Sequence, residues 1–324
     1  MNPSADIERA AAALRAGELV AFPTETVYGL GADARNPTAL NKIYALKGRP
    51  TSHPLILHLA DAAELPQWVA DVPPAAKQLA ERFWPGPLTL VLPRAAGVPD
   101  ELTGGQESVA VRVPAHPVAR ALLTAFGGGV AAPSANRYGR VSPTQAEHVR
   151  EEFPEGLLVL EGGDCEVGLE STIVSLLGPR PQLLRPGAIS RLELEKILGP
   201  FAGTAEATAQ PRVPGSTSQH YAPRTPVSLA PPADLAAAWK AALERGEPVA
   251  VMARGAAPVA GTSPPGFCWQ RMPNQAIDYG RELYATLRRL DKLGVSRILV
   301  ESVPEGSDWD AARDRLSRAA ATFL

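Results

Sequence analysis

Residues 199–225 read GPFAGTAEATAQPRVPGSTSQHYAPRT, and this stretch decides how the chain is divided. It is rich in small, proline and polar residues and has few large aliphatic residues that could anchor it in a core, a composition typical of a linker. Hydrophobic patterning typical of folded domains lies on both sides of it. The sequence therefore predicts a first domain at 1–198, a linker at 199–225 and a smaller second domain at 226–324.

The first domain alternates short apolar segments with amphipathic ones. Strands are predicted at 19–22, 55–59, 88–92, 109–113, 130–132, 157–160 and 172–176. Helices are predicted at 75–83, 117–126 and 144–153, with a further helix ending near Lys47. This order predicts an α/β domain built on one open, twisted sheet.

The second domain repeats the alternation on a smaller scale. Strands are predicted at 227–229, 249–252 and 298–300, and helices at 235–243, 276–293 and 309–323. Strands that alternate with helices favour a parallel, Rossmann-like sheet.

Composition and charge exclude several classes of protein. Hydrophobic residues make up 45% of the 324 residues and charged residues 20%, with a formal net charge of −2. These values are typical of a globular protein. They argue against a protein whose entire surface is basic and binds a polyanion such as a nucleic acid. No run of eighteen apolar residues suggests a membrane span, and two distant cysteines, Cys165 and Cys268, suit a reducing compartment. We expect a cytoplasmic protein that does not bind membranes.

Common catalytic motifs are missing from the sequence. There is no Walker A, HExxH, GxSxG or CxxC motif, and the five histidines include no pair four residues apart, so no protein-built metal site is expected. Residues 29–34 match GxGxxA formally, but 23–28 separate them from the preceding strand, which disfavours a dinucleotide site.

Polar residues instead follow predicted strand ends, where open α/β sheets bind ligands. The loop PTETVYGLG, 23–31, carries Thr24, Glu25, Thr26 and Tyr28, more polar groups than a turn needs. Lys47 and Arg49 in KGRP suit a multiply charged anion such as a nucleotide phosphate, although a helix end also favours cations by itself.

Arg112 lies inside an apolar strand, SVAVR, where period two places it on one face with Ser108 and Ala110. A cation there is costly unless it is paired or binds an anion. Ser142 precedes a predicted helix, so it is either the helix N-cap or a phosphate ligand.

Seven motifs in this order resemble a known family: PTETVYGLG, KGRP, PLILH, SVAVRVP, APSAN, EST and LRPG. They closely resemble the threonylcarbamoyl-AMP synthases of the YrdC-like class. The linker's PGSTSQHYAP, followed by a second α/β domain, resembles the long, two-domain branch of that class.

The resemblance implies a nucleotidyltransferase that uses L-threonine, bicarbonate and ATP with Mg²⁺ to make threonylcarbamoyl-AMP and pyrophosphate. The product would serve the downstream machinery that transfers threonylcarbamoyl to tRNA, and we expect direct contact of this chain with tRNA to be weak. The linker would fold over the site as a lid.

The resemblance also implies site residues. The family signature, which we take as catalytic, corresponds to Lys47, Arg49, Ser134 and Asn136. The expected threonine site comprises Thr26, His58, Arg112, Ala132, Ser171 and Thr172. The expected ATP site comprises Arg49, His53, Ser108, Ser134, Ser142, Arg185 and Tyr221.

Two alternatives remain open on the residues alone. Lys47, Arg49 and Arg112 would also serve an RNA-binding module, which a steep salt dependence of tRNA binding would reveal. The first domain would also suit a carbamoyl-transfer accessory protein, which would consume carbamoyl phosphate without cleaving ATP to AMP.

Overall fold

The computed structural model describes residues 3–153, 155–202, 211–215, 221–257 and 266–321. The chain divides into two compact units, one formed by 1–138 with 142–216 and the other by 139–141 with 217–324. Much of the expected lid, 203–210 and 216–220, lies outside the described residues, so its role stays a prediction.

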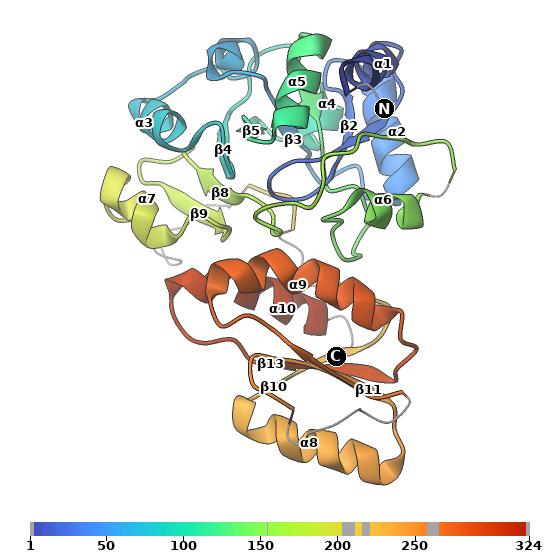
Figure 1. The fold of residues 1–324 in the computed structure, drawn as a ribbon. Coiled ribbons are helices and arrows are strands. Elements are labelled where there is room, and N and C mark those ends of the chain that lie inside the picture. Colours follow the sequence, from blue (N-terminus) through green and yellow to red (C-terminus); the bar gives the residue numbers. More distant parts are fainter. Residues whose placement is uncertain (1–2, 154, 203–210, 216–220, 258–265, 322–324) are drawn as a thin grey trace. The chain divides into compact units, whose positions relative to one another are not determined.

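The first unit is built on a nine-stranded mixed sheet with the order β7-β1-β2-β6-β3-β5-β4-β8-β9 (Figure 1). Its strands are β1 (Val20–Phe22), β2 (Gly29–Asp33), β3 (Ile56–His58), β4 (Leu88–Pro93), β5 (Ser108–Arg112), β6 (Val130–Ala131), β7 (Leu158–Val159), β8 (Thr172–Ser175) and β9 (Gln182–Arg185). Its helices are α1 (Pro3–Arg15), α2 (Pro37–Lys47), the 3-10 helix η1 (Ala62–Gln67), α3 (Pro74–Phe83), α4 (Asp100–Thr103), α5 (Pro117–Phe126), α6 (Ala146–Glu152) and α7 (Arg191–Leu198). The predicted α/β class with one open sheet is confirmed.

Strand β2 was not predicted, and its position removes the dinucleotide interpretation. Gly29–Asp33 pairs antiparallel with β1 instead of opening a helix. A Cβ at Gly31 would lie 2.8 Å from the Phe22 ring and 3.1 Å from the Val20 carbonyl oxygen. The glycine therefore allows close packing of the strand, not the approach of a pyrophosphate.

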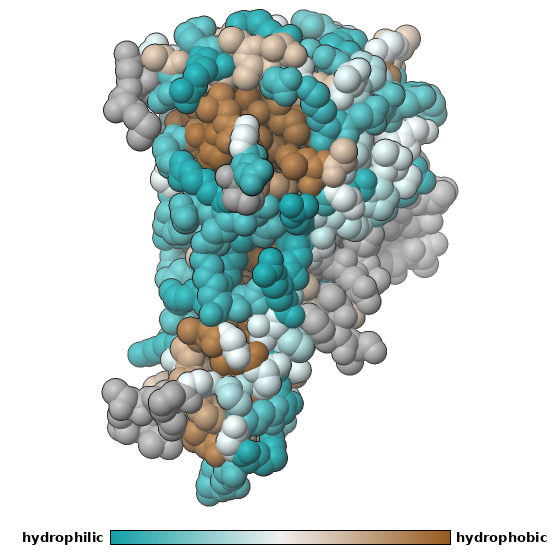
Figure 2. Space-filling model, turned by 90° about the vertical axis from the view of Figure 1, so that its right-hand side faces the viewer, coloured by the Kyte–Doolittle hydropathy of each residue, from teal (hydrophilic) through white to brown (hydrophobic). Residues whose placement is uncertain are grey.

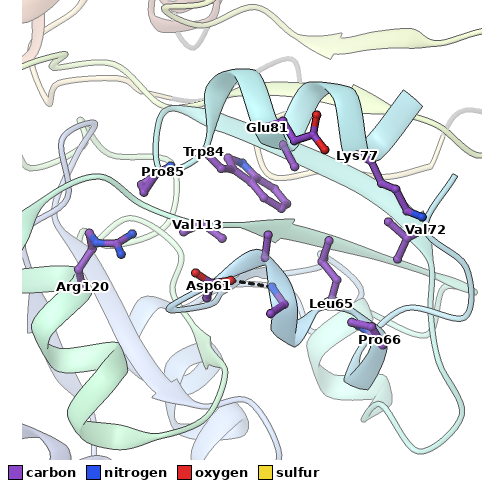
Figure 3. A pocket seen from close by; sticks show the side chains of 13 residues that line it. Asp61, Leu65, Pro66, Val72, Lys77, Glu81, Trp84, Pro85, Val113 and Arg120 are labelled. Atoms are coloured by element: carbon purple, nitrogen blue, oxygen red, sulfur yellow. Dashed lines mark hydrogen bonds between the residues drawn. The ribbon is translucent and has the colours of Figure 1, made fainter. Parts of the chain in front are cut away.

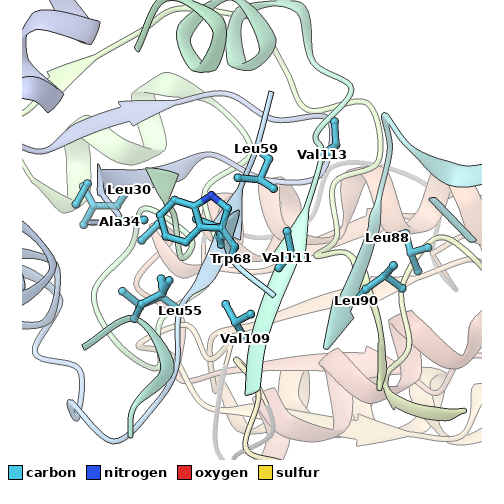
Figure 4. Packing of buried hydrophobic residues seen from close by; sticks show 14 of the residues in the cluster. Leu30, Ala34, Leu55, Leu59, Trp68, Leu88, Leu90, Val109, Val111 and Val113 are labelled. Atoms are coloured by element: carbon cyan, nitrogen blue, oxygen red, sulfur yellow. The ribbon is translucent and has the colours of Figure 1, made fainter. Parts of the chain in front are cut away.

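The two faces of the central strands carry different kinds of side chain. Val109, Val111 and Val113 join the main hydrophobic core, which includes Trp68 and several leucines (Figure 4). The alternate residues of β5, which include Arg112, therefore point to the opposite face. One face of the sheet packs in the main core. The other face carries a smaller hydrophobic cluster that includes Ile56 and Ala110, and beside it the buried polar residues such as Arg112.

The second unit contains a four-stranded sheet in which every described pairing is parallel, as predicted. Its strands, in the order β10-β13-β11-β12, are β10 (Val227–Ala230), β13 (Arg297–Glu301), β11 (Val249–Ala253) and β12 (Cys268–Arg271). Figure 1 shows α9 (Ala276–Asp291) and α10 (Asp310–Ala320) on one face and α8 (Pro232–Arg245) on the other, with the 3-10 helix η3 (Ser307–Trp309) before α10. Strand β12 was missed because its four residues are only half-buried and lack an apolar run.

Within the described ranges, no helix is both long and apolar enough to cross a membrane. Figure 2 shows that one face of the first unit carries a compact apolar area bordered by hydrophilic side chains. Apart from such areas, the visible surface is mostly hydrophilic.

Candidate active site

The polar face of the central sheet brings together residues from β3 and β5. These strands pair in parallel, with His58 opposite Arg112 and Ile56 opposite Ala110. Side chains that are opposite each other in register project to the same face, so His58 and Arg112 are neighbours. Ser108, at the start of β5, shares that face, and all three residues are buried.

Arg112 is fixed by three groups from two loops. Its Nε donates to the Gly86 carbonyl at 3.2 Å, its Nη1 donates to Thr26 Oγ1 at 2.8 Å, and its Nη2 lies 2.7 Å from Glu25 Oε1. The Arg112 side chain is only 4% exposed. The predicted cost of a cation in this strand is therefore offset by the Glu25 carboxylate.

The neighbours of the Thr26 hydroxyl determine to which atom it donates its hydrogen. Thr24 Oγ1 donates its hydrogen to the Val27 carbonyl at 2.6 Å, so it can only accept from Thr26 Oγ1, which is 2.8 Å away. Thr26 thus donates to Thr24 and accepts from Arg112. Any lone pair that Thr26 still offers suits a ligand donor such as an amino group.

His58 is neutral in this arrangement. Burial, followed by the nearby Arg112 charge, lowers the pKa of His58 to about 3. Its Nδ1 lies 3.1 Å from the Ile56 carbonyl and therefore carries the hydrogen, which leaves Nε2 as an acceptor.

Lys47 ties the end of α2 to the loop that follows β6. Its ammonium donates to the Ser134 carbonyl at 2.6 Å and to the Asn136 carbonyl. Gly48 ends the helix in the left-handed conformation with φ 63°. Burial, and then the Arg49 charge, holds the pKa of Lys47 well below its usual value. Lys47 thus positions the Ser134–Asn136 backbone.

Arg49 and His53 meet Tyr138. The Arg49 guanidinium donates to the Pro54 carbonyl at 2.9 Å and lies 5.7 Å from the Tyr138 ring centre. The Tyr138 hydroxyl is 3.0 Å from His53 Nδ1. Burial and the Arg49 charge lower the pKa of His53. The two predicted ATP residues are therefore adjacent, with a tyrosine that the sequence analysis did not single out.

Arg185, at the end of β9, holds the segment around Ser171. Its Nε and Nη2 donate to the Ser171 carbonyl at 3.1 and 2.9 Å, and Nη1 donates to the Pro214 carbonyl at 3.0 Å. The Ser171 hydroxyl also lies 2.7 Å from Thr89 Oγ1. The neighbouring Thr172 hydroxyl instead donates to the Ile189 carbonyl, so it anchors the turn after β9.

Ser142 is not a helix cap. Helix α6 begins after Gln145, which makes no side-chain cap, whereas Ser142 Oγ donates to the buried Glu170 carboxylate at 2.5 Å. The N-cap interpretation is wrong because α6 begins only at Ala146, so Ser142 lies too far before the first turn to cap it. Ala132 lies at the edge of β6, where its backbone N–H donates to the Ile56 carbonyl at 2.9 Å.

Tyr221 belongs to the second unit, together with 139–141. It has φ 62°, is 2% exposed, and stacks on Tyr284 of α9 at 5.8 Å between ring centres. The Arg315 guanidinium lies 5.1 Å from the Tyr221 ring centre. The aromatic ring of this predicted ATP residue is thus packed within the second unit.

Comparison with known proteins shows the family of this chain. The family model Sua5/YciO/YrdC, described as "Telomere recombination", matches residues 12–187. A second model, described as the C-terminal domain of threonylcarbamoyl-AMP synthase, matches residues 189–321. This chain belongs to the Sua5/YciO/YrdC family.

Relatives of the same two-domain length support that membership. The threonylcarbamoyl-AMP synthase of Bacillus subtilis is 40% identical, and the alignment covers 97% of this chain and 92% of the relative. The crystal structure of Pyrococcus abyssi Sua5 complexed with L-threonine is 38% identical, with a TM-score of 0.88 and coverage of 97% and 94%. The similarity to these Sua5 proteins extends over both units.

The residues of the family signature meet in the first unit. Lys47 contacts the backbone at both Ser134 and Asn136, although these positions are almost ninety residues away in the sequence. Glu25 was named from sequence as part of the polar loop 23–31 but was given no role. Glu170, Thr89 and Tyr138 were not assigned to the site, because Glu, Thr and Tyr are common surface residues and only their burial or contacts distinguish them.

A pocket of about 470 Å³ lies elsewhere in the first unit, between η1 and α3 (Figure 3). Leu65, Trp84 and Val113 line it, with Lys77 and Glu81 at its sides. Val113 follows Arg112 and projects to the opposite face of β5, so this pocket is separate from the polar face. None of the predicted site residues lines it.

The buried carboxylates near the site already have partners within the protein. Among the described residues, no cluster of three or more His, Cys, Asp or Glu side chains could hold a metal. The buried carboxylates of Glu25 and Glu170 are already engaged by Arg112 and Ser142. Mg²⁺ keeps several waters and commonly binds through substrate phosphates, which fits this arrangement.

Proposed function

We propose that this chain is a threonylcarbamoyl-AMP synthase, which makes threonylcarbamoyl-AMP for the threonylcarbamoyladenosine modification of tRNA. The observation that carries the proposal is a nearly fully buried arginine, Arg112, on a polar sheet face, in a chain that aligns end to end with enzymes of that name. A buried cation with matched partners is suited to a small carboxylate substrate.

The proposed substrates are L-threonine, bicarbonate and ATP, and the chain acts as a nucleotidyltransferase. The amine of threonine takes up carbon dioxide as a carbamate, whose oxygen attacks the α-phosphorus of ATP while pyrophosphate leaves. Mg²⁺ bound to the phosphates would neutralise part of their charge. The protein supplies positioning and fixed positive charge.

Each cluster has a role in this reaction. Arg112, with Thr26 and neutral His58, holds threonine by its carboxylate and polar groups. Arg49, His53 and Arg185 face the nucleotide, while Lys47 fixes the Ser134–Asn136 loop beside it. Since Lys47 is buried and its pKa is depressed, it acts through this loop and not as a mobile phosphate ligand.

The product is proposed to pass to the machinery that transfers threonylcarbamoyl to tRNA, and the reaction is proposed to take place in the cytoplasm. Direct recognition of tRNA by this chain is not needed, because the adenylate is a small diffusible molecule. The chain's net charge of −2 is consistent with a protein that does not bind tRNA strongly itself.

Pyrophosphate release tests the proposal. The protein is incubated with ATP, bicarbonate and one amino acid at a time, and we expect threonine to stimulate release well above serine. Equal stimulation by serine and threonine would contradict the substrate assignment.

Arg49→Ala should abolish the threonine-dependent signal, because it removes the cation beside His53 and Tyr138. Arg9→Ala, at an exposed position on α1, is the matched control and should keep it. Full activity of Arg49→Ala would contradict the nucleotide role of the KGRP motif.

A further inference from the structure

The ion pair between Glu25 and Arg112 leaves one atom of each side chain without a hydrogen bond. Glu25 Oε1 and Arg112 Nη2 are 2.7 Å apart, and the two side chains are 7% and 4% exposed. Across the described residues, neither atom has a hydrogen-bond partner, which means that the N–H groups of Nη2 are not directed at Oε1. The pair attracts electrostatically but is not a formed hydrogen bond.

Other atoms of both groups are well held. Glu25 Oε2 accepts from the Ala115 backbone N–H at 3.1 Å, and the Glu25 carbonyl accepts from the Val167 N–H at 2.8 Å. Arg112 is fixed through Nε and Nη1 by Gly86 and Thr26. The misalignment is therefore built into the fold by contacts on both sides of the pair.

A buried donor or acceptor without a hydrogen bond is destabilising, so such atoms call for an explanation. Here the two atoms are of opposite kind and adjacent. A ligand that brings an acceptor to Arg112 Nη2 and a charged donor to Glu25 Oε1 would satisfy both. An α-amino acid carries its carboxylate and its ammonium group on the same carbon atom, which matches this spacing.

The charge balance favours the same ligand class. Arg112 and Glu25 neutralise each other, and His58 beside them is uncharged at neutral pH. A zwitterion enters such a site without adding net charge. An acid that lacks the amino group would add a negative charge next to the Glu25 carboxylate, which is unfavourable in a buried setting.

We propose that Glu25 recognises the amino group of the amino-acid substrate through Oε1, while Arg112 Nη2 takes the carboxylate. This inference rests on the proposed function and adds a specificity residue to it.

The first test uses the unmodified protein and two ligands, L-threonine and 3-hydroxybutyrate, which lacks only the amino group. Isothermal titration calorimetry should show about 10- to 100-fold weaker binding of 3-hydroxybutyrate, the factor that corresponds to one charge-assisted hydrogen bond. Equal affinities for the two ligands would overturn the proposal without the need for any variant.

The second test compares Glu25→Gln with Glu107→Gln. Glu25→Gln keeps the shape and an acceptor for Ala115 but removes the charge, so threonine affinity should fall about 10-fold or more. Affinity for 3-hydroxybutyrate should stay the same or rise, because a repulsive carboxylate is removed. Glu107, which is paired with Arg94 at an 88% exposed position, is the matched control and should change neither affinity.

An equal loss of affinity for both ligands in Glu25→Gln would indicate a purely structural role and overturn the proposal, as would an unchanged affinity for threonine. Failure of the proposed function gives a different result, namely no threonine binding and no threonine-dependent pyrophosphate release by the unmodified protein.

Discussion

Arg112 ends β5, and Arg94 directly follows the adjacent strand β4. Both are paired with glutamate, yet their surroundings differ sharply. Arg112 and its partner Glu25 are 4% and 7% exposed. Arg94 is 19% exposed, and its partners Asp100 and Glu107 are 72% and 88% exposed. Water can replace the partners of Arg94 but not those of Arg112. Only the buried pair therefore needs an oppositely charged partner for each of its two groups.

An ion pair alone therefore does not mark a ligand-binding site. Burial of the pair distinguishes Arg112 from the surface-exposed Arg94. Four variants or conditions test this conclusion, in order of falling effect on stability.

Arg112→Met should have the largest effect. It leaves the Glu25 carboxylate buried without its cation, which costs about 3–5 kcal/mol of unfolding free energy, and it removes the proposed carboxylate ligand. Urea denaturation measures the first effect and threonine titration the second. A loss below about 1 kcal/mol would place Arg112 in the same class as Arg94.

The neutral His58 should make stability depend on pH. The pKa of His58 in the folded state is about 3, below its ordinary value of 6.5 in the unfolded chain. Between these values the unfolded state binds more protons, so stability rises with pH, with a slope approaching about 1.4 kcal/mol per pH unit, and levels off above 6.5. Urea denaturation from pH 4 to 7.5 should show a shallower slope in His58→Gln, and identical slopes would contradict a neutral buried His58.

Lys47→Met removes the donor that the Ser134 and Asn136 carbonyls share. Leaving buried carbonyls without a partner should cost about 1–3 kcal/mol of stability. Because the loop then loses its tether, threonine-dependent pyrophosphate release should fall more than the loss of folded protein accounts for. Thermal denaturation and kinetics on the same sample check this, and an unchanged turnover number would show that the tether does not position the loop.

Arg94→Ala should have the smallest effect. Its two ion pairs are solvent-accessible, so their loss should cost no more than about 1 kcal/mol of unfolding free energy and leave threonine binding unchanged. Urea denaturation at low and high salt checks this result. A cost comparable with that of Arg112→Met would break the contrast between the two arginines.

Local patterns predicted much of the fold. Period-two alternation in 109–113 correctly placed the valines and Arg112 on opposite faces, because side chains of a strand alternate whatever its neighbours are. Strand β2 was missed because its glycine-rich sequence, GLGAD, has no strand signature of its own. It is a strand because β1 and β6 pair with it and Phe22 packs against it.

Local patterns served less well for single charged residues. By sequence, Arg281, Arg288, Arg289 and Lys292 are expected to form a solvated face of the helix predicted at 276–293. In the structure Arg288, on α9, is 8% exposed and donates to the Val141 carbonyl. A residue's position on a helix predicts exposure only when nothing else packs there, and residues 139–141 belong to the same unit as α9.

The α/β class, the position of the polar loops and the residue types that could bind a nucleotide and an amino acid were all predictable, because they follow from local periodicity and from motif residues. Three contacts could be found only in the folded chain: Lys47 holds a backbone loop, Ser142 pairs with Glu170, and Glu25 lies against Arg112. Such contacts join residues up to about ninety positions apart, and what each group can do depends on burial and direction, which no local pattern encodes.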